Sequence, residues 1–204
     1  MVTAGRLVPE DLDALLAEVR GCRVCAADLP LGPRPVLRAA ASARLLLVGQ
    51  APGTKVHASG KPWTDASGDR LRDWLDLDAA RFYDTRHIAI VPMGFCYPGA
   101  LPRGGDRPPR PECAPLWHPR IAASLPRVAL TVLIGQYAQA WYLGARRKRT
   151  LTGTVAAWRD YLPGCFPIPH PSWRTLGWQR RNPWFDEELL PELRRRVHAL
   201  VGAG

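Results

Sequence analysis

The sequence contains no apolar run that could cross a membrane, because no stretch approaches the roughly 20 apolar residues of a transmembrane helix. Residues 1–7 carry no long apolar run after a basic segment, so they do not resemble a signal peptide. Internal repeats and long low-complexity linkers are absent as well. From these absences we expect a cytoplasmic protein that does not contact membranes, in a compartment where disulfides are rare.

Acidic residues are scarce relative to basic ones. The chain has 28 Lys and Arg against 18 Asp and Glu, for a net charge of +10. Such an excess attracts polyanions, and binding that neutralises phosphates would weaken with salt. Charge alone leaves nucleic-acid binding open, because Arg heavily outnumbers Lys and a generally basic proteome would give the same excess. At 204 residues and 47% hydrophobic content, we expect one domain with a core that needs no disulfide scaffold.

Strand and helix patterns alternate along the chain. Short apolar runs predict four strands at residues 44–48, 87–91, 128–134 and 166–168. Helical spacing predicts helices at residues 9–19, 67–77, 112–125, 136–143 and 185–201. The alternation predicts a single α/β domain over residues 1–204, with three layers and a mainly parallel four-stranded sheet flanked by helices. Ligands of such sheets bind beyond the carboxyl ends of the strands, so the loops after the four strands should share one face.

Three segments carry the residue types of a binding site. Residues 48–53 (VGQAPG) directly follow the first strand, and their glycines and proline allow a sharp turn and close approach to a ligand. Residues 60–71 (GKPWTDASGDRL) place Trp63 and Asp65 before a Ser-Gly helix start. Residues 169–172 (PHPS) follow the last strand, and their prolines fix the chain around one imidazole.

The order GQAPG, GKPWTDASG and HPS resembles the uracil-DNA glycosylase superfamily, most closely its branches called families 4 and 5. The resemblance covers most of the chain, roughly residues 20 to 190. It implies a uracil-DNA glycosylase-like fold and a monofunctional hydrolase of base-excision repair, most similar to monomeric enzymes. Such an enzyme flips a deaminated base, uracil first among candidates, out of DNA and cleaves its N-glycosidic bond.

The resemblance also implies roles for individual residues. Trp63 would stack on the base, and amides near Gln50 and Ala51 would read the base edge. His170 would hydrogen-bond the base carbonyl and stabilise negative charge as the bond breaks. Asp65 is the candidate for water activation, and its alternative role is an N-cap of the following helix. Gln50 joins these two in the catalytic group although Gln cannot act as a general base. The remaining base-binding candidates are Gly49, Pro52, Gly53, Met93, Gly94 and Ser172.

One departure from the family 4 pattern affects base specificity. That pattern has an Asn shortly before the third cysteine, and residues 90–96 (IVPMGFC) contain none. Main-chain groups near Met93 and Gly94 could take its place, or the substrate could differ from uracil.

The loop after the histidine motif offers a wedge for the gap that a flipped base leaves. Trp173, Arg174 or Leu176 could serve, and the alternative is a surface loop whose aromatics pack on the last helix. His57 lies in the loop after the first strand, where it could contact a phosphate, take part in catalysis or simply be solvated.

Four cysteines form a possible metal-binding set. Cys22 and Cys25 form a C-x-x-C pair, and Cys96 and Cys113 flank an Arg-rich loop. This set fits a four-thiolate zinc site or, as the resemblance implies, a [4Fe–4S] cluster. The third possibility is that the four cysteines are unrelated buried thiols. Cys165 is expected to be a core thiol outside the set.

Two functions compete with the glycosylase. One is a relative that binds damaged or single-stranded DNA without excising a base, which the missing Asn and Gln50 motivate. The other is a nucleotide-binding α/β protein unrelated to DNA, because fold alone does not fix function.

Overall fold

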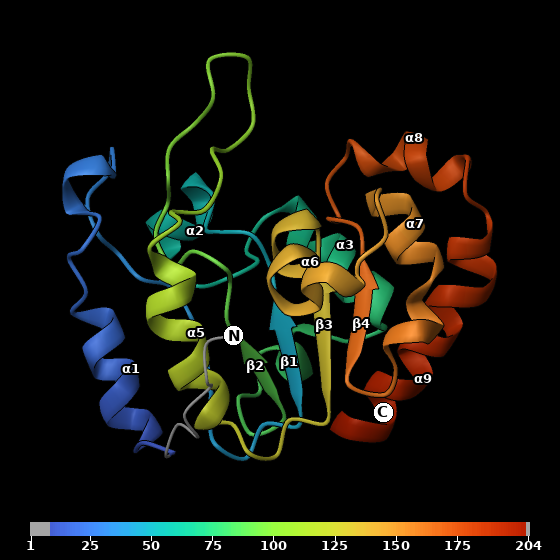
Figure 1. The fold of residues 1–204 in the computed structure, drawn as a ribbon, viewed down its shortest axis with the longest axis horizontal. Helices are drawn as coiled ribbons and strands as arrows, with labels where there is room; N and C mark the ends of the chain where they lie inside the picture. Colours follow the sequence, from blue (N-terminus) through green and yellow to red (C-terminus); the bar gives the residue numbers. More distant parts are fainter. Residues whose placement is uncertain (1–8, 203–204) are drawn as a thin grey trace.

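A four-stranded parallel sheet forms the centre of the computed structural model, which describes residues 9–202 (Figure 1). The strands are β1 (Leu45–Val48), β2 (Ile88–Ile90), β3 (Leu130–Ile134) and β4 (Cys165–Ile168), in the order β2-β1-β3-β4. β1 lies between two partners, and its Leu45 pairs with both Ile88 and Leu130. The predicted α/β fold with flanking helices is confirmed, and the sheet is parallel throughout rather than mainly parallel.

Helices connect and cover the strands. They are α1 (Leu12–Arg20), α2 (Thr54–Ser59), α3 (Ala66–Leu75), α4 (Ala79–Phe82), α5 (Cys113–Ala123), α6 (Gln136–Leu143), α7 (Leu151–Ala156), α8 (Thr175–Arg180) and α9 (Leu190–Val201). α1 begins later than predicted because the Asp11 side chain accepts the amide of Ala14 at 2.8 Å and caps the helix. The helix predicted from residue 185 starts as a π-helical turn at Phe185–Leu189 and continues as α9.

The sheet separates two hydrophobic clusters, which makes three layers. Successive side chains of a strand point to opposite faces. Leu45 and Leu47 of β1 therefore pack in the cluster that contains the buried residues of α3 and α9. Leu46 and Val48 pack in the second cluster, with the buried residues of α1, α5 and α6. Both faces of the sheet are covered, as a parallel sheet requires.

All four strands end at the same edge of the sheet, and the long loop between β2 and α5 rises from this edge (Figure 1). The chain bends sharply there, since glycines with positive φ stand at Gly99, Gly104, Gly105 and Gly135. Within the described range of residues 9–202, no helix is long and apolar enough to cross a membrane.

Candidate active site

A cavity of about 410 Å³ lies at the carboxyl edge of the sheet. The residues of the three predicted segments and the following loop that line it are Gly49, Gln50, Ala51, Pro52, Gly53, Pro62, Trp63, Asp65, Ser67, His170, Ser172, Trp173 and Arg174. The structure therefore brings together segments that are more than 100 residues apart in sequence, counting from Trp63 to His170. This grouping follows from the parallel sheet, whose strand ends meet at one edge.

Trp63 is held in an unusual backbone conformation, with φ at 58°. Its carbonyl oxygen accepts hydrogen bonds from Arg72 Nη1 and from the Tyr83 hydroxyl, both at 3.1 Å. A side chain at Gly68 would overlap this carbonyl, and a Cβ at Gly49 would lie 2.7 Å from Cζ2 of the indole. Left-handed backbone at a bulky residue marks a position that its surroundings enforce. Two glycines and two hydrogen bonds thus fix the indole in the cavity wall.

His170 lies beside this indole, with the two ring centroids 5.7 Å apart and the planes tilted by 35°. Its carbonyl oxygen accepts the Ser172 amide at 2.8 Å and the Thr175 hydroxyl at 2.5 Å, which fixes the turn. Burial lowers the pKa of His170, and the nearby Asp65 carboxylate acts in the opposite direction. The imidazole is therefore neutral at neutral pH and can present a single N–H donor.

Asp65 caps a helix and also lines the cavity. Its Oδ1 accepts the Gly68 amide at 2.9 Å, so it is the N-cap of α3. The same residue lines the cavity. Because capping uses one carboxylate oxygen, the cap also fixes the orientation of the side chain toward the cavity.

A second carboxylate, Asp106, also lines this cavity, and the sequence did not predict it as a site residue. It lies in the loop between β2 and α5, where Ala100 and Asp106 form an antiparallel bridge. Partial burial raises the pKa of Asp106, Asp65 raises it further and Arg174 opposes both. The only sequence signal is an Asp that follows Gly104-Gly105, a pair that predicts a tight turn but no partner across the cavity.

Gln50 has a structural connection that the sequence does not reveal. Its side-chain Nε2 donates to the Arg107 carbonyl at 3.2 Å, and its main-chain carbonyl accepts the Gly94 amide at 2.9 Å. The Met93 amide likewise donates to Gly49 O at 2.9 Å, and the Met93 side chain is buried in the core. Neither Met93 nor Gly94 lines the cavity. Both amides thus bond to the loop after β1, and the proposal that main-chain groups near Met93 and Gly94 read the base stays a prediction.

The loop before α8 forms one rim of the cavity. Trp173 is 73% exposed, and the Arg174 guanidinium lies 5.3 Å from its ring centroid. Leu176 is 43% exposed but belongs to α8 and does not line the cavity. His57 lies in α2 and also does not line it. Its Nδ1 is buried and has no hydrogen-bond partner among residues 9–202, and its ring lies 6.3 Å from that of Tyr97. Of these candidates, Trp173 and Arg174 are placed to touch a ligand.

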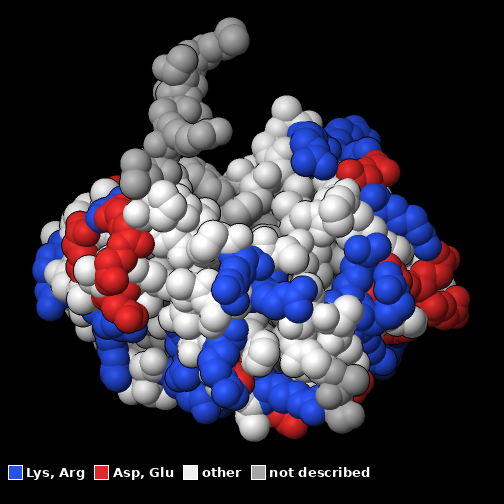
Figure 2. Space-filling model, turned by 90° about the horizontal axis from the view of Figure 1, so that it is seen from below, with Lys and Arg blue, Asp and Glu red and all other residues white. Residues whose placement is uncertain are grey.

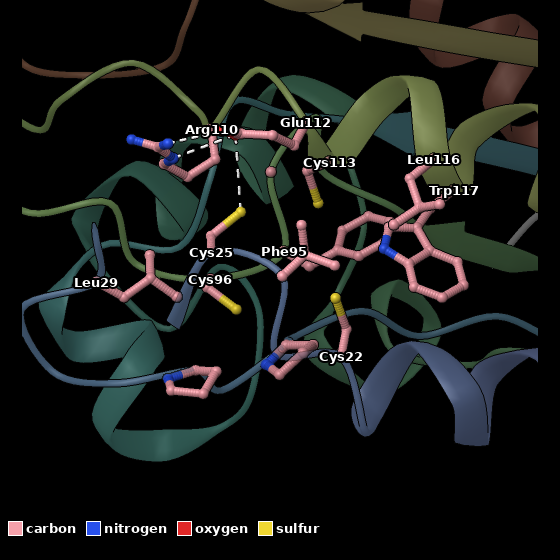
Figure 3. Close-up of a pocket in the computed structure, with 14 residues that line it drawn as sticks. Cys22, Cys25, Leu29, Phe95, Cys96, Arg110, Glu112, Cys113, Leu116 and Trp117 are labelled. Carbon is pink, nitrogen blue, oxygen red and sulfur yellow. Dashed lines mark hydrogen bonds and ion pairs between the residues drawn. The ribbon is translucent and has the colours of Figure 1, made fainter. Parts of the chain in front are cut away.

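The four predicted ligand cysteines line a second, largely apolar cavity (Figure 3). Cys22 follows α1 and Cys25 lies in the next turn, whereas Cys96 follows β2 and Cys113 begins α5. All four are free thiols. Burial, with smaller contributions from the other three cysteines, raises the pKa of Cys113 to about 12.

The chemistry of this set fits a cationic metal group. Four thiolates in apolar surroundings repel one another, so a metal must neutralise them before they can all be ionised. Aromatic and aliphatic side chains such as Phe95 and Leu29 surround the sulfurs (Figure 3). Among residues 9–202, no group of three or more His, Cys, Asp or Glu side chains is arranged to hold a single metal ion. Cys165 does not line this cavity; it starts β4 and pairs with Thr131.

Basic side chains are not confined to the cavity edge. Figure 2 shows the opposite face, at the amino ends of the strands, where Lys and Arg side chains form several patches. Acidic side chains gather toward two sides of this view. The net charge of +10 therefore provides a general attraction for polyanions, and the cavity rather than the charge locates the site.

A comparison with protein families gives one match over most of the chain. The family model described as the uracil DNA glycosylase superfamily matches residues 38–194. The matched range contains every residue named above in the larger cavity, together with Cys96 and Cys113. It begins after Cys22 and Cys25.

Proposed function

Because the chain belongs to the uracil DNA glycosylase superfamily, we propose that it is a monofunctional DNA glycosylase that removes a deaminated base, with uracil as its first substrate. One observation carries this proposal: Trp63, Asp65 and His170 line the same cavity at the carboxyl edge of the sheet. An aromatic face, a carboxylate and a neutral imidazole are the groups that a base-flipping hydrolase needs.

The cavity suits a base that has been rotated out of the DNA stack. Its volume of about 410 Å³ lies within the range of small-molecule sites. Trp63 forms part of one wall, so its indole can stack on the base face and offset the loss of stacking in the duplex. Its fixed backbone keeps the ring in place before the base arrives, which reduces the ordering cost of binding.

Breaking the glycosidic bond leaves negative charge on the departing base. His170 supports this step as a neutral donor that is held in place by two hydrogen bonds to its own carbonyl. The sugar becomes cation-like, and Asp65 stabilises it and orients the attacking water. The N-cap bond to Gly68 keeps one carboxylate oxygen fixed while the other serves the reaction.

The rim residues supply contacts to the DNA outside the base pocket. Trp173 has an exposed ring that can enter the gap left by the flipped nucleotide. Arg174 lies next to it and can reach a phosphate. The positive net charge adds a salt-dependent attraction along the DNA.

We also propose that Cys22, Cys25, Cys96 and Cys113 hold a [4Fe–4S] cluster. A structural zinc ion held by the same four cysteines is the alternative occupant. When bound, the cluster supplies a covalent link between the segment after α1, the end of β2 and the start of α5. Its role in this proposal is structural, because the cysteines do not line the base cavity.

The test is base release from single- and double-stranded oligonucleotides that carry uracil, hypoxanthine or only normal bases. Strand cleavage at the resulting abasic site gives the readout. Uracil release is expected, with no release from normal DNA. Folded protein that binds these oligonucleotides tightly and releases no base would instead identify a DNA-binding relative. The hydrogen bond from Gln50 Nε2 to the Arg107 carbonyl favours that alternative, because it occupies the side-chain amide of a residue in the predicted catalytic group.

A further inference from the structure

The loop between β2 and α5 contains a narrow hairpin that carries Asp106 to the cavity. The Arg107 amide donates to Gly99 O and the Leu101 amide to Gly105 O, both at 2.8 Å. Gly99 and Gly105 have φ of 99° and 93°, conformations that L side chains rarely adopt. The bond from Gln50 to the Arg107 carbonyl ties the base of this hairpin to the loop after β1. Main-chain hydrogen bonds on both sides of the hairpin thus position Asp106.

The surroundings of Asp106 come from three parts of the fold. A Cβ at Gly53 would lie 3.4 Å from Asp106 Oδ2, so the carboxylate lies against the loop after β1. Asp65 faces it from the start of α3, and Arg174 faces it from the loop before α8. On the same loop, the Asp106 carboxylate and the Arg107 guanidinium both lie close enough to Tyr97 to interact with it electrostatically. One cation and one carboxylate therefore reach Asp106 from across the cavity.

The two carboxylates have different environments. Asp65 accepts an amide hydrogen bond at the N-terminus of the ten-residue helix α3, where negative charge is stabilised. Asp106 caps none of the helices described within residues 9–202, and its partial burial together with the charge of Asp65 raises its pKa. Two carboxyl groups that share one cavity tend to divide the acid and base roles according to their surroundings. The cap bond of Asp65 and the partial burial of Asp106 therefore favour Asp65 as the proton acceptor and Asp106 as the proton donor.

We propose that Asp106 is a further catalytic residue that donates its proton to the departing base, while Asp65 accepts a proton from the attacking water. This proposal rests on the glycosylase function proposed above. It adds a proton donor to a site in which the His170 hydrogen bond alone would otherwise stabilise the negative charge on the departing base. It also widens the chemical range of the site, because bases that leave poorly as anions, such as deaminated purines, need protonation.

The step balances as a hydrolysis. The bond between C1′ of the sugar and the base nitrogen breaks, and its electron pair goes to the base. The Asp106 proton passes to the base, which leaves as a neutral molecule. The water oxygen forms a bond to C1′ and gives its proton to Asp65. Proton exchange with solvent then restores protonated Asp106 and ionised Asp65.

The test compares pH profiles of single-turnover base release by the wild type, Asp106→Asn and Asp73→Asn. Asn is close in size to Asp and can still donate a hydrogen bond, but it cannot transfer a proton. Asp73 is an exposed carboxylate on α3 outside the cavity, so it is the matched control. Above the pH at which Asp106 ionises, the wild-type and Asp73→Asn rates are expected to fall about tenfold per pH unit. Asp106→Asn is expected to be slower and to lack this limb.

Each outcome decides one question. If Asp106→Asn keeps the wild-type rate and the wild-type high-pH limb, Asp106 is not the proton donor and the glycosylase function stands. A slower variant with an unchanged limb assigns Asp106 a positioning role and also overturns proton donation. If the wild type releases no base at any pH, the proposed function itself fails. Equal urea midpoints for the three proteins exclude a folding effect.

Discussion

The α-carbon of Gly49 lies against the indole of Trp63, so that a Cβ on Gly49 would be only 2.7 Å from Cζ2. The first residue after β1 and the proposed stacking residue are therefore packed without space for a methyl group between them. The Trp63 main chain cannot shift to relieve such a contact, because its carbonyl is held by Arg72 and Tyr83, so the indole ring would have to move. The position of the Trp63 ring therefore depends on the lack of a side chain at Gly49.

Gly49→Ala is expected to displace the Trp63 indole into the cavity and to lower kcat/KM for base release by tenfold or more, which is about 1.4 kcal/mol of transition-state stabilisation. Gly164→Ala is the matched control, because nothing lies within 4 Å of a Cβ at that position. Steady-state kinetics on a uracil oligonucleotide measures both. Equal kcat/KM for the two variants would contradict the proposed packing role.

Substitutions at Asp65 separate its cap from its chemistry. Asp65→Asn keeps an oxygen that can accept the Gly68 amide, so stability should change by less than about 1 kcal/mol. The same variant loses the charge and the base, so base release should fall by about 100-fold or more. Asp65→Ala should show the same loss of base release and should also be less stable by about 1 kcal/mol, because the cap is removed. Urea unfolding and single-turnover kinetics give the two readouts, and normal activity of Asp65→Asn would leave the cap as its only role.

The cysteine set predicts a coloured protein. Cys96→Ala should give colourless protein whose melting temperature is lower by about 10 °C, for a loss of about 3 kcal/mol. Cys165→Ala is the control, because Cys165 lies in β4 and does not line the cysteine cavity. Visible absorbance, iron analysis and thermal melting measure the outcome. A brown Cys96→Ala protein with normal melting would contradict the assignment, as would zinc without iron in the wild type.

Buried His118 predicts loss of stability in mild acid. Its Nε2 donates to the Pro92 carbonyl at 2.9 Å, and its Nδ1 accepts the Tyr142 hydroxyl at 3.0 Å. Burial lowers the pKa of His118 to about 4, from about 6.5 for an exposed His. Between these values the unfolded chain binds a proton that the folded chain does not. The free energy of unfolding should therefore fall as pH falls from about 6.5 to 4, by on the order of 3 kcal/mol from this group.

Urea unfolding at pH 7.5 and pH 5 measures this dependence in the wild type and in His118→Gln. Buried His170 acts in the same direction in both proteins, so the difference between them isolates His118. The variant should be less stable at pH 7.5, because hydrogen bonds are lost, and should show a shallower pH dependence. An unchanged dependence would show that His118 is not the group that titrates.

Much of the fold is encoded in local patterns. β1 and α6 lie at or within one residue of their predicted bounds, because a fully apolar run and a compact helical repeat are strong signals. α2 falls in a stretch expected to be loop, since six residues with one buried side chain give no periodicity. The grouping of Trp63 with His170 was predictable from the rule that parallel strands end at one edge.

The rest of the site depends on tertiary contacts that a linear pattern does not contain. Asp106 reaches the cavity only because a hairpin folds back and Gln50 holds its base. The amides of Met93 and Gly94 bond to the loop after β1, which requires the strand order β2-β1. Such pairings join residues far apart in the chain, and periodicity does not report them.

Single-turnover release of uracil by the wild type and by His170→Ala, at saturating protein, tests the central claim most directly. The wild type should release uracil and leave an abasic site, and His170→Ala should bind the same DNA but release the base about 100-fold or more slowly. Equal rates in the two proteins would contradict the role assigned to the imidazole. No release by folded, cluster-loaded wild type would contradict the glycosylase function.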